Sequence, residues 1–379
     1  MSGTTQSEGS TPPTSRQPQP APGTAGHLVL VYARRQVRAL RDLRDPARAG
    51  DPDAVHRMRV ASRRLRSCLR THRTVLDREY TRGVEQGLRV LAAELGAERD
   101  REVLRRRLLA HLGELPPELV RGPIERRIRE YTGTDTGADT AIDPTGHTDT
   151  DTVAEPGQPG QSVEGGGPVS SVAVAGSFDL VARVPAPADP AGDPADDPAS
   201  APDRPRAVPA LDPHRHGALL DDLTALLENP PLLPDARRPA RPVLARALRR
   251  ERERCAGLLA TARRVPDGPD RDAAWHRARR AAKRARYAAE AAEPALGPVA
   301  RAEATGFRRL QELLDDRQDG VLARAALLDL ARRAEEAGES AFTHGVLHGR
   351  ETARAREVER AVGVVEGASD PLPARGPVR

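Results

Sequence analysis

The segment His56–Arg66, HRMRVASRRLR, recurs without a gap 220 residues later as His276–Arg286, HRARRAAKRAR. Each histidine and each basic residue of the first copy is matched by a histidine or a basic residue in the second. Chance rarely produces such a match in this order, even in a chain rich in arginine. The repeat therefore indicates that the chain contains two related halves.

Helical spacing places the basic residues of each copy on one stripe. At about 100° per residue they fall within an arc of about 80°, and Met58, Leu65 and Leu69 occupy the adjoining arc. The stripes consist of His56, Arg59, Arg63, Arg66 and Arg70 in the first half, and of His276, Arg279, Lys283 and Arg286 in the second. A solvated face would commonly include acids at i,i+4 spacing, yet residues 54–76 contain none. We therefore expect each stripe to border the core and to bind an anion in a groove, with a solvated charged face as the alternative.

A second shared element follows each stripe. LGAERDREVL at 95–104 resembles LDDRQDGVL at 314–322, and a basic residue, Arg89 or Arg308, precedes each of them. Asp100 and Asp319 occupy matching positions within this element. We predict that they are N-caps of the following helices, and the alternative is that each holds a groove arginine.

The apolar periodicity predicts an all-α protein. Helices are expected from about His27 to the turn at Asp51, where Asp53 would cap the next helix, and then over 54–76, 79–95, 99–113, 117–131, 214–228, 240–264, 271–292, 299–314, 318–337 and 339–364. Aromatic residues make up only 2% of the chain, so the core must consist of Leu, Ala and Val. Closely packed helices suit these residues better than a β-sandwich.

Composition and charge divide the chain into segments. Residues 27–131 and 211–364 are expected to form the two halves of a helical domain, separated by a disordered insertion at 132–210 and flanked by tails at 1–26 and 365–379. The insertion has a net charge of −10, which leaves +15 for the rest of the chain. A surface so basic attracts polyanions, although a general bias toward arginine would also produce one.

The sequence also favours a cytoplasmic protein. Two cysteines, Cys68 and Cys255, are too few for a disulfide framework and fit a reducing compartment. The first 26 residues lack the apolar stretch of a signal peptide, and no run approaches the length of a membrane span. We therefore expect no membrane association.

Five segments together resemble the CHAD domain, the conserved histidine α-helical domain. They are VHRMRVASRRLRS at 55–67, LGAERDREVL at 95–104, HRARRAAKRARY at 276–287, LQELLDDRQDGVLA at 310–323 and FTHGVLHGRE at 342–351. The resemblance covers nearly all of the chain except the tails and the acidic insertion. The chain departs from the pattern at Asp315, where the family commonly has Gly, and at Arg317, where it commonly has His.

The resemblance implies two antiparallel four-helix bundles related by pseudo-twofold symmetry, with a central basic groove that binds inorganic polyphosphate and associates with polyphosphate granules. Carried over by position, the binding residues would be His56, Arg59, Arg63, Arg66 and Arg89 in the first half, and His276, Arg279, Lys283, Arg286 and Arg308 in the second. The protein partners and the oligomeric state are left open by the sequence.

Other functions receive less support from the sequence. The only lysine, Lys283, lacks a phosphate-cradling glycine loop, and neither G-x-S-x-G nor H-E-x-x-H occurs, so we expect neither an enzyme nor a cofactor. His344 and His348 could chelate a metal ion, but no nearby Cys or carboxylate completes a set. Nucleic-acid backbones would attract the same cations, yet single-strand binders usually add aromatic platforms, which are scarce here. A scaffold anchored to polyphosphate is a further alternative.

Overall fold

The computed structural model describes residues 19–133 and 212–367, and within these ranges the chain is helical, with two isolated β-bridges and no strand. The prediction of an all-α protein is therefore confirmed. Most of the acidic insertion predicted at 132–210, and most of both predicted tails, lie outside the described residues. The segment 169–184, whose sequence could suit a strand pair but is expected to be a loop, also lies outside them.

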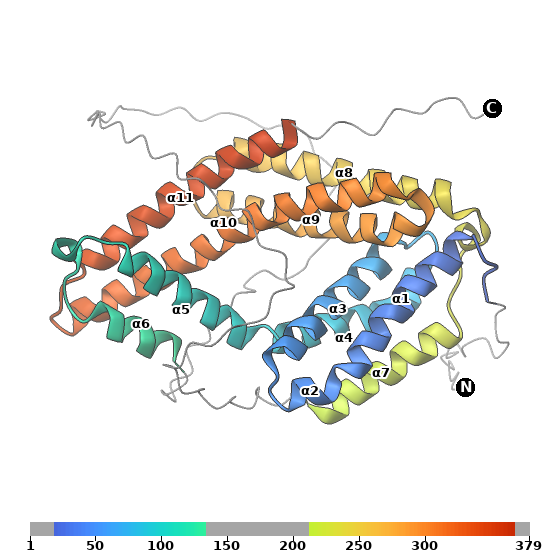
Figure 1. Ribbon diagram of the computed structural model, residues 1–379, viewed down its shortest axis with the longest axis horizontal. Coiled ribbons are helices and arrows are strands. Elements are labelled where there is room, and N and C mark those ends of the chain that lie inside the picture. Colours follow the sequence, from blue (N-terminus) through green and yellow to red (C-terminus); the bar gives the residue numbers. More distant parts are fainter. Residues whose placement is uncertain (1–18, 134–211, 368–379) are drawn as a thin grey trace, which may run out of the picture. The chain divides into compact units, whose positions relative to one another are not determined.

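The helices are labelled in Figure 1. Before the insertion they are α1 (Ala25–Asp42), α2 (Arg44–Arg48), α3 (Pro52–Thr71), α4 (Arg78–Glu94), α5 (Ala97–Gly113) and α6 (Ile124–Thr132). After it they are α7 (Pro213–Glu228), α8 (Ala240–Arg264), α9 (Pro269–Leu296), α10 (Pro298–Glu336) and α11 (Phe342–Gly367). Two short 3-10 helices occupy Pro117–Leu119 and Pro234–Arg237. Helix α11 thus extends to Gly367, beyond the expected start of the C-terminal tail at residue 365.

Helix α3, which carries the first stripe, begins and ends earlier than the sequence predicts. Its N-cap is Asp51, whose side chain accepts hydrogen bonds from the backbone of Asp53 and Ala54. The expectation that Asp53 is the cap was therefore wrong, because Pro52 occupies the first helical position, where its missing N–H costs nothing. The helix ends at Thr71 because the next residues pair elsewhere, with the backbone N–H of Leu233 donating to the Val75 carbonyl at 2.9 Å.

Two expected helix boundaries differ because of local backbone chemistry. The helix predicted over 117–131 is broken at Gly122, whose φ of 75° lies in the left-handed region, and at the following Pro123. The helices predicted over 299–314 and 318–337 form the single helix α10. In the first half, by contrast, the chain turns at Gly96 between α4 and α5. Asp315 occupies the matching position in α10, and there the helix continues.

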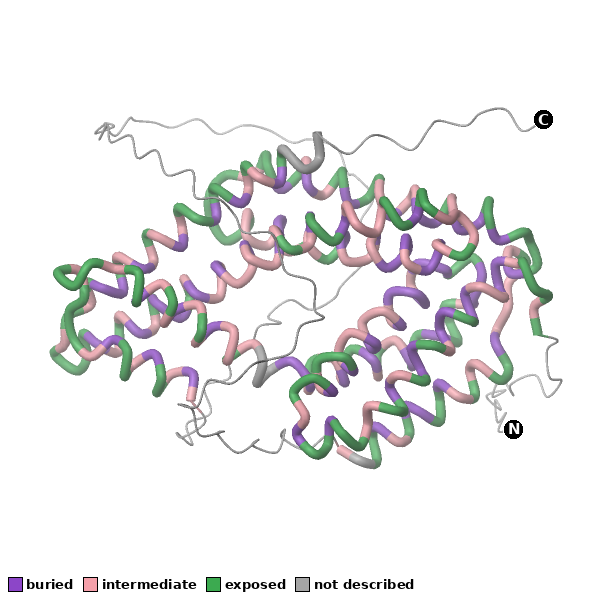
Figure 2. The backbone as a smooth tube through the Cα atoms, in the orientation of Figure 1, coloured by how far each residue is buried: buried purple, intermediate pink, exposed green. Residues whose placement is uncertain are grey.

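Helix packing crosses the boundary between the two sequence halves. Helix α7 packs against α1 and α4, while α5 and α6 pack against α10. One core cluster includes Leu30, Leu69, Leu88 and Leu223, from α1, α3, α4 and α7. Another combines residues of α5 and α6 with residues of α10 and α11. Buried positions accordingly follow the inward faces of helices from both halves (Figure 2).

Alanine-rich surfaces bring α8, α9 and α10 close together. Helix α9 buries a row that includes Ala278, Ala281, Ala282 and Ala285, all at 0% exposure. Small side chains permit close approach of helix axes, which fits a core poor in aromatic residues. Helix α9 is thereby held with its basic stripe beside the core, as α3 is in the first half.

Candidate functional site

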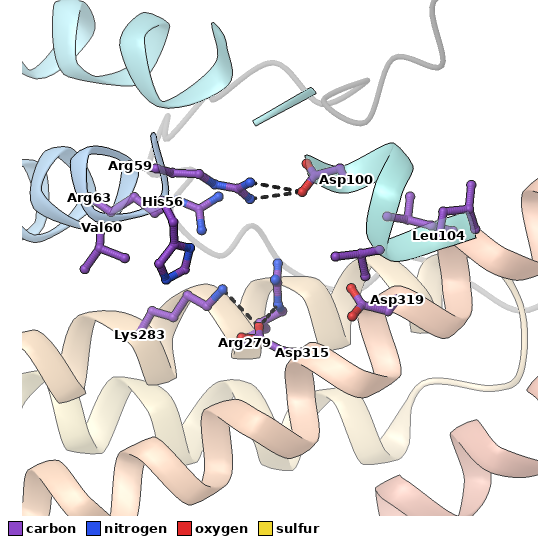
Figure 3. A pocket seen from close by; sticks show the side chains of 12 residues that line it. His56, Arg59, Val60, Arg63, Asp100, Leu104, Arg279, Lys283, Asp315 and Asp319 are labelled. Carbon is purple, nitrogen blue, oxygen red and sulfur yellow. Dashed lines mark hydrogen bonds and ion pairs between the residues drawn. The ribbon is translucent and has the colours of Figure 1, made fainter. Parts of the chain in front are cut away.

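The two basic stripes meet at one cleft of about 250 Å³. Helices α3 and α5 line one side of it, and α9 and α10 line the other (Figure 3). The lining residues are His56, Arg59, Val60, Arg63, Asp100, Val103, Leu104, Arg279, Lys283, Asp315, Asp319 and Leu322. Each half of the sequence thus contributes two helices to the same site.

Residues at matching positions of the repeat line this cleft in pairs. Arg59 corresponds to Arg279, and Arg63 corresponds to Lys283. All four residues are half-buried, and Figure 3 shows them between the same helices. The structure therefore brings these four positions and His56 to one cleft between helices.

Helical geometry explains why these cations border the core. On α3, Met58, Leu65 and Leu69 are buried at 2% exposure or less and fix the orientation of the helix. Arg59 and Arg63 follow the buried Met58 and Ser62 by one residue each and therefore lie at the edge of this buried face. The apolar contacts thus fix the side of α3 from which these arginines project.

In the first half of the cleft, Asp100 neutralises Arg59. Both terminal nitrogens of Arg59 donate to Asp100 Oδ1 at 3.1 Å, and Nη1 also lies 3.5 Å from the Gly96 carbonyl oxygen. Asp100 lies inside α5, whose N-cap is Gly96, so the prediction that Asp100 caps this helix was wrong. The alternative is confirmed, because Asp100 holds a groove arginine.

In the second half of the cleft, a different residue, Asp315, neutralises the cations. Asp315 accepts a hydrogen bond from Arg279 Nε and lies 2.9 Å from Lys283 Nζ. Although burial alone would raise the pKa of Asp315, Arg279 and Lys283 hold it below its ordinary value. Asp315 is therefore ionised at neutral pH.

Asp319, the counterpart of Asp100, has a different environment. It lies within the continuous helix α10 and so caps no helix, contrary to the prediction. Within the described part of the chain it makes no ion pair, because Arg279, the counterpart of Arg59, bonds to Asp315 instead. Burial raises the pKa of Asp319 to about 6, although Arg279 counters part of the shift.

Burial and neighbouring positive charges destabilise the charged forms of two cations of the cleft. Burial, together with the nearby charges of Arg59 and Arg279, lowers the pKa of Arg63 to about 10. Among the described residues, Arg63 has no hydrogen-bonding or ion-pair partner. Burial and Arg279 also lower the pKa of Lys283 to about 8, and Asp315 offsets only part of that shift. An anion entering the cleft would therefore relieve repulsion among desolvated cations.

The remaining stripe residues do not line this cleft. His276 Nδ1 lies 2.9 Å from Gln318 Oε1, and burial lowers the pKa of His276. Arg286 donates to Glu290 at 2.9 Å and to Gln311 at 3.1 Å. Arg66 is half-buried on α3 outside the lining.

Arg89 and Arg308 are exposed and also lie outside the cleft lining. Each bonds to a residue one turn earlier on its own helix: Arg89 Nε donates to Gln86 at 3.1 Å, and Arg308 Nη2 donates to Thr305 at 3.5 Å. The structure therefore does not bring these two cations into the cleft with the stripe residues.

Sequence reasoning missed the part that Asp315 takes in the cleft and the apolar portion of its lining. Val60, Val103, Leu104 and Leu322 complete the walls. The alignment of the halves offered a signal, because it sets Asp315 opposite Gly96 and so adds a carboxylate to the second half. In the sequence alone, that carboxylate stands out only as a departure from the family pattern.

Metal coordination receives no support from the described residues, which contain no group of three or more His, Cys, Asp or Glu side chains placed to hold an ion. His344 is 2% exposed, and burial lowers its pKa. Within residues 19–133 and 212–367, no helix is long and apolar enough to cross a membrane.

The fold and the cleft define an all-helical protein in which two repeated halves line one cleft. The model of the CHAD domain matches residues 31–141 and 175–328. The chain therefore belongs to the CHAD domain family.

Two known proteins are similar to this chain in sequence. Two uncharacterised proteins from two strains of Mycobacterium tuberculosis are each 29% identical over 304 residues, which is 80% of this chain and 45% of theirs. The chain thus spans about half the length of these curated relatives.

Two solved structures share the fold. PptA from Streptomyces chartreusis matches with a TM-score of 0.58 and 20% identity, covering 91% of this chain and 99% of that one. The CHAD domain from the plant Ricinus communis matches with a TM-score of 0.57 and 19% identity, covering 96% of this chain and 98% of its own. At this identity the likeness bears on the fold alone.

Proposed function

We propose that the protein binds inorganic polyphosphate in the cleft between α3, α5, α9 and α10, and that it acts as a binder rather than as an enzyme. Membership of the CHAD family supports a function related to polyphosphate. The observation that carries the proposal is the convergence of Arg59, Arg63, Arg279 and Lys283 on one cleft. Binding would also place the protein on polyphosphate granules.

The chemistry of the cleft suits a chain of phosphates. Guanidinium and ammonium groups make charge-assisted hydrogen bonds to phosphate oxygens. Arg63 contributes a desolvated cation that is not yet bonded to a carboxylate in the described structure, and Lys283 contributes a second buried charge. None of the twelve lining residues is Ser, Thr, Cys or Tyr, so the lining offers no hydroxyl or thiol nucleophile. Recruitment without bond cleavage fits these residues best.

The direct test replaces the four convergent cations with alanine and measures binding of a long polyphosphate at several salt concentrations. Each lost phosphate contact lowers the slope of log affinity against log salt by about 0.7. Losing four contacts should therefore reduce the slope by about 3 and the affinity by at least about a hundredfold at low salt. The buried core positions Met58, Leu65 and Leu69 are unchanged, so helicity should be retained.

A matched control removes the same number of charges outside the cleft. Arg105 and Arg106 pair with Glu102, and Arg332 and Arg333 pair with Asp329, all on their own helices. Replacing these four arginines with alanine should leave most of the affinity and the salt slope. Equal losses in the two quadruple variants would show that binding follows net charge, and duplex DNA competing as well as polyphosphate would favour a nucleic-acid binder.

A further inference from the structure

The two halves of the cleft differ by one carboxylate. In the first half, Arg59 bonds to Asp100, and Gly96 places only its carbonyl near the guanidinium. In the second half, Asp315 replaces the glycine and bonds to both Arg279 and Lys283. Its other oxygen accepts a hydrogen bond from Gln311 Nε2 at 3.2 Å.

This carboxylate bonds to the two cations of α9 that a phosphate group would have to reach. Arg279 and Lys283 are one turn apart on α9, and the Oδ1 atom of Asp315 receives both of them. Asp319, which matches the Asp100 that binds the first-half arginine, is left without an ion pair in the described structure. The second-half cations are therefore already bonded to a resident anion, whereas Arg63 is not.

We propose that Asp315 is an internal competitor for phosphate, and that it makes the cleft discriminate against short phosphate anions in favour of long chains. The inference rests on the proposed function of the cleft. A phosphate that reaches Arg279 and Lys283 must displace the carboxylate, and that cost falls on every ligand confined to the cleft.

Ligand length decides how much of this cost affects the observed affinity. Pyrophosphate is small enough to depend wholly on the cleft cations. A long chain also contacts exposed arginines elsewhere on the basic body, such as Arg89 and Arg308, so part of its affinity does not depend on whether Asp315 has been displaced. The discrimination thus arises from contacts outside the cleft that only a long chain can add.

The test measures pyrophosphate and long polyphosphate binding to the wild type and to the Asp315→Asn variant, at about pH 7 and fixed ionic strength. The substitution keeps the shape of the side chain and removes its charge. Pyrophosphate affinity should rise about tenfold or more, the size expected when one charge-assisted hydrogen bond need no longer be displaced. Long-chain affinity should rise by less than about threefold, so that the ratio of the two affinities narrows.

Asp329→Asn supplies a matched control, because Asp329 also bonds to two arginines but lies outside the cleft lining. It removes the same charge and should leave both affinities nearly unchanged. Asp315→Ala provides a second variant that favours the helix should the amide disturb it.

Several results would overturn the inference. An unchanged or weaker pyrophosphate affinity in both Asp315 variants would mean that the carboxylate organises the cations rather than competing with phosphate. An equal gain for short and long ligands would remove the length discrimination. If the four-cation alanine variant binds long polyphosphate as well as the wild type does, the proposed function itself fails, and this outcome is distinct from the other two.

Discussion

Raising the pH from 7 to 9 is expected to weaken polyphosphate binding about tenfold, through loss of the Lys283 proton. Burial and the charge of Arg279 lower the pKa of this lysine to about 8. If only the charged form binds phosphate, the competent fraction falls about tenfold over this interval. An ordinary lysine, with a pKa of 10.5, would remain charged throughout.

The stability of the ligand-free protein should change in the opposite direction. The folded-state pKa of Lys283 lies below its ordinary value, so the unfolded chain binds more protons between about pH 8 and 10.5. For this group alone, the free energy of unfolding is therefore lowest below pH 8 and rises across that window, by at most about 3 kcal/mol. General alkaline unfolding would instead lower both affinity and stability.

The assay is a titration with long polyphosphate at constant ionic strength between pH 7 and 9, where the internal phosphates keep a constant charge. Lys283→Arg is the control, because a guanidinium keeps its charge over this range. The variant should show a nearly flat profile. The reasoning would be refuted by a flat profile in the wild type, or by an equal slope in both proteins.

Two further predictions concern the rest of the chain. Deleting residues 135–208 should preserve helicity and cooperative thermal unfolding, which circular dichroism would follow, and loss of cooperative unfolding would contradict this. The deletion should also tighten polyphosphate binding at low salt, because it removes a net acidic segment that competes for the basic surface. Glu351→Gln should lower the free energy of unfolding by about 3 kcal/mol in a denaturant titration, because Glu351 is 1% exposed and accepts two hydrogen bonds from Arg107, at 2.8 and 2.7 Å. Glu114→Gln, at an exposed pair with Arg350, should change it by less than about 1 kcal/mol.

Much of the fold and part of the site followed from local patterns. The periodicity of apolar residues is a local property, so most helices could be placed within a few residues of their observed bounds. The stripe on α3 could be oriented because its apolar neighbours define the buried face. The repeat then identified α9 as its counterpart, and Arg59, Arg63, Arg279 and Lys283 were predicted together with His56.

The pairings of these residues could not be predicted in the same way. Asp100 was assigned to a helix cap because capping is a local rule, yet it bonds to Arg59 across 41 positions of sequence. Glu290 bonds to Arg286 on its own helix and also to Arg64 of α3, so its choice of partners depends on how two helices pack. A carboxylate has several cations within reach in an arginine-rich chain, and only the packed arrangement selects among them.

The sequence by itself determined the helical class, the two-fold repeat and the cations that border the core, because each of these depends on residue spacing along one helix. The tertiary structure alone decided that α7 joins α1 and α4, that α5 faces α10, and that Asp315 takes the cations of α9 while Asp319 remains unpaired in the described structure. These outcomes depend on distances between helices far apart in the chain. Ionic contacts act over a few ångströms, so helix packing determines which charges of the cleft are neutralised and which remain to bind a ligand.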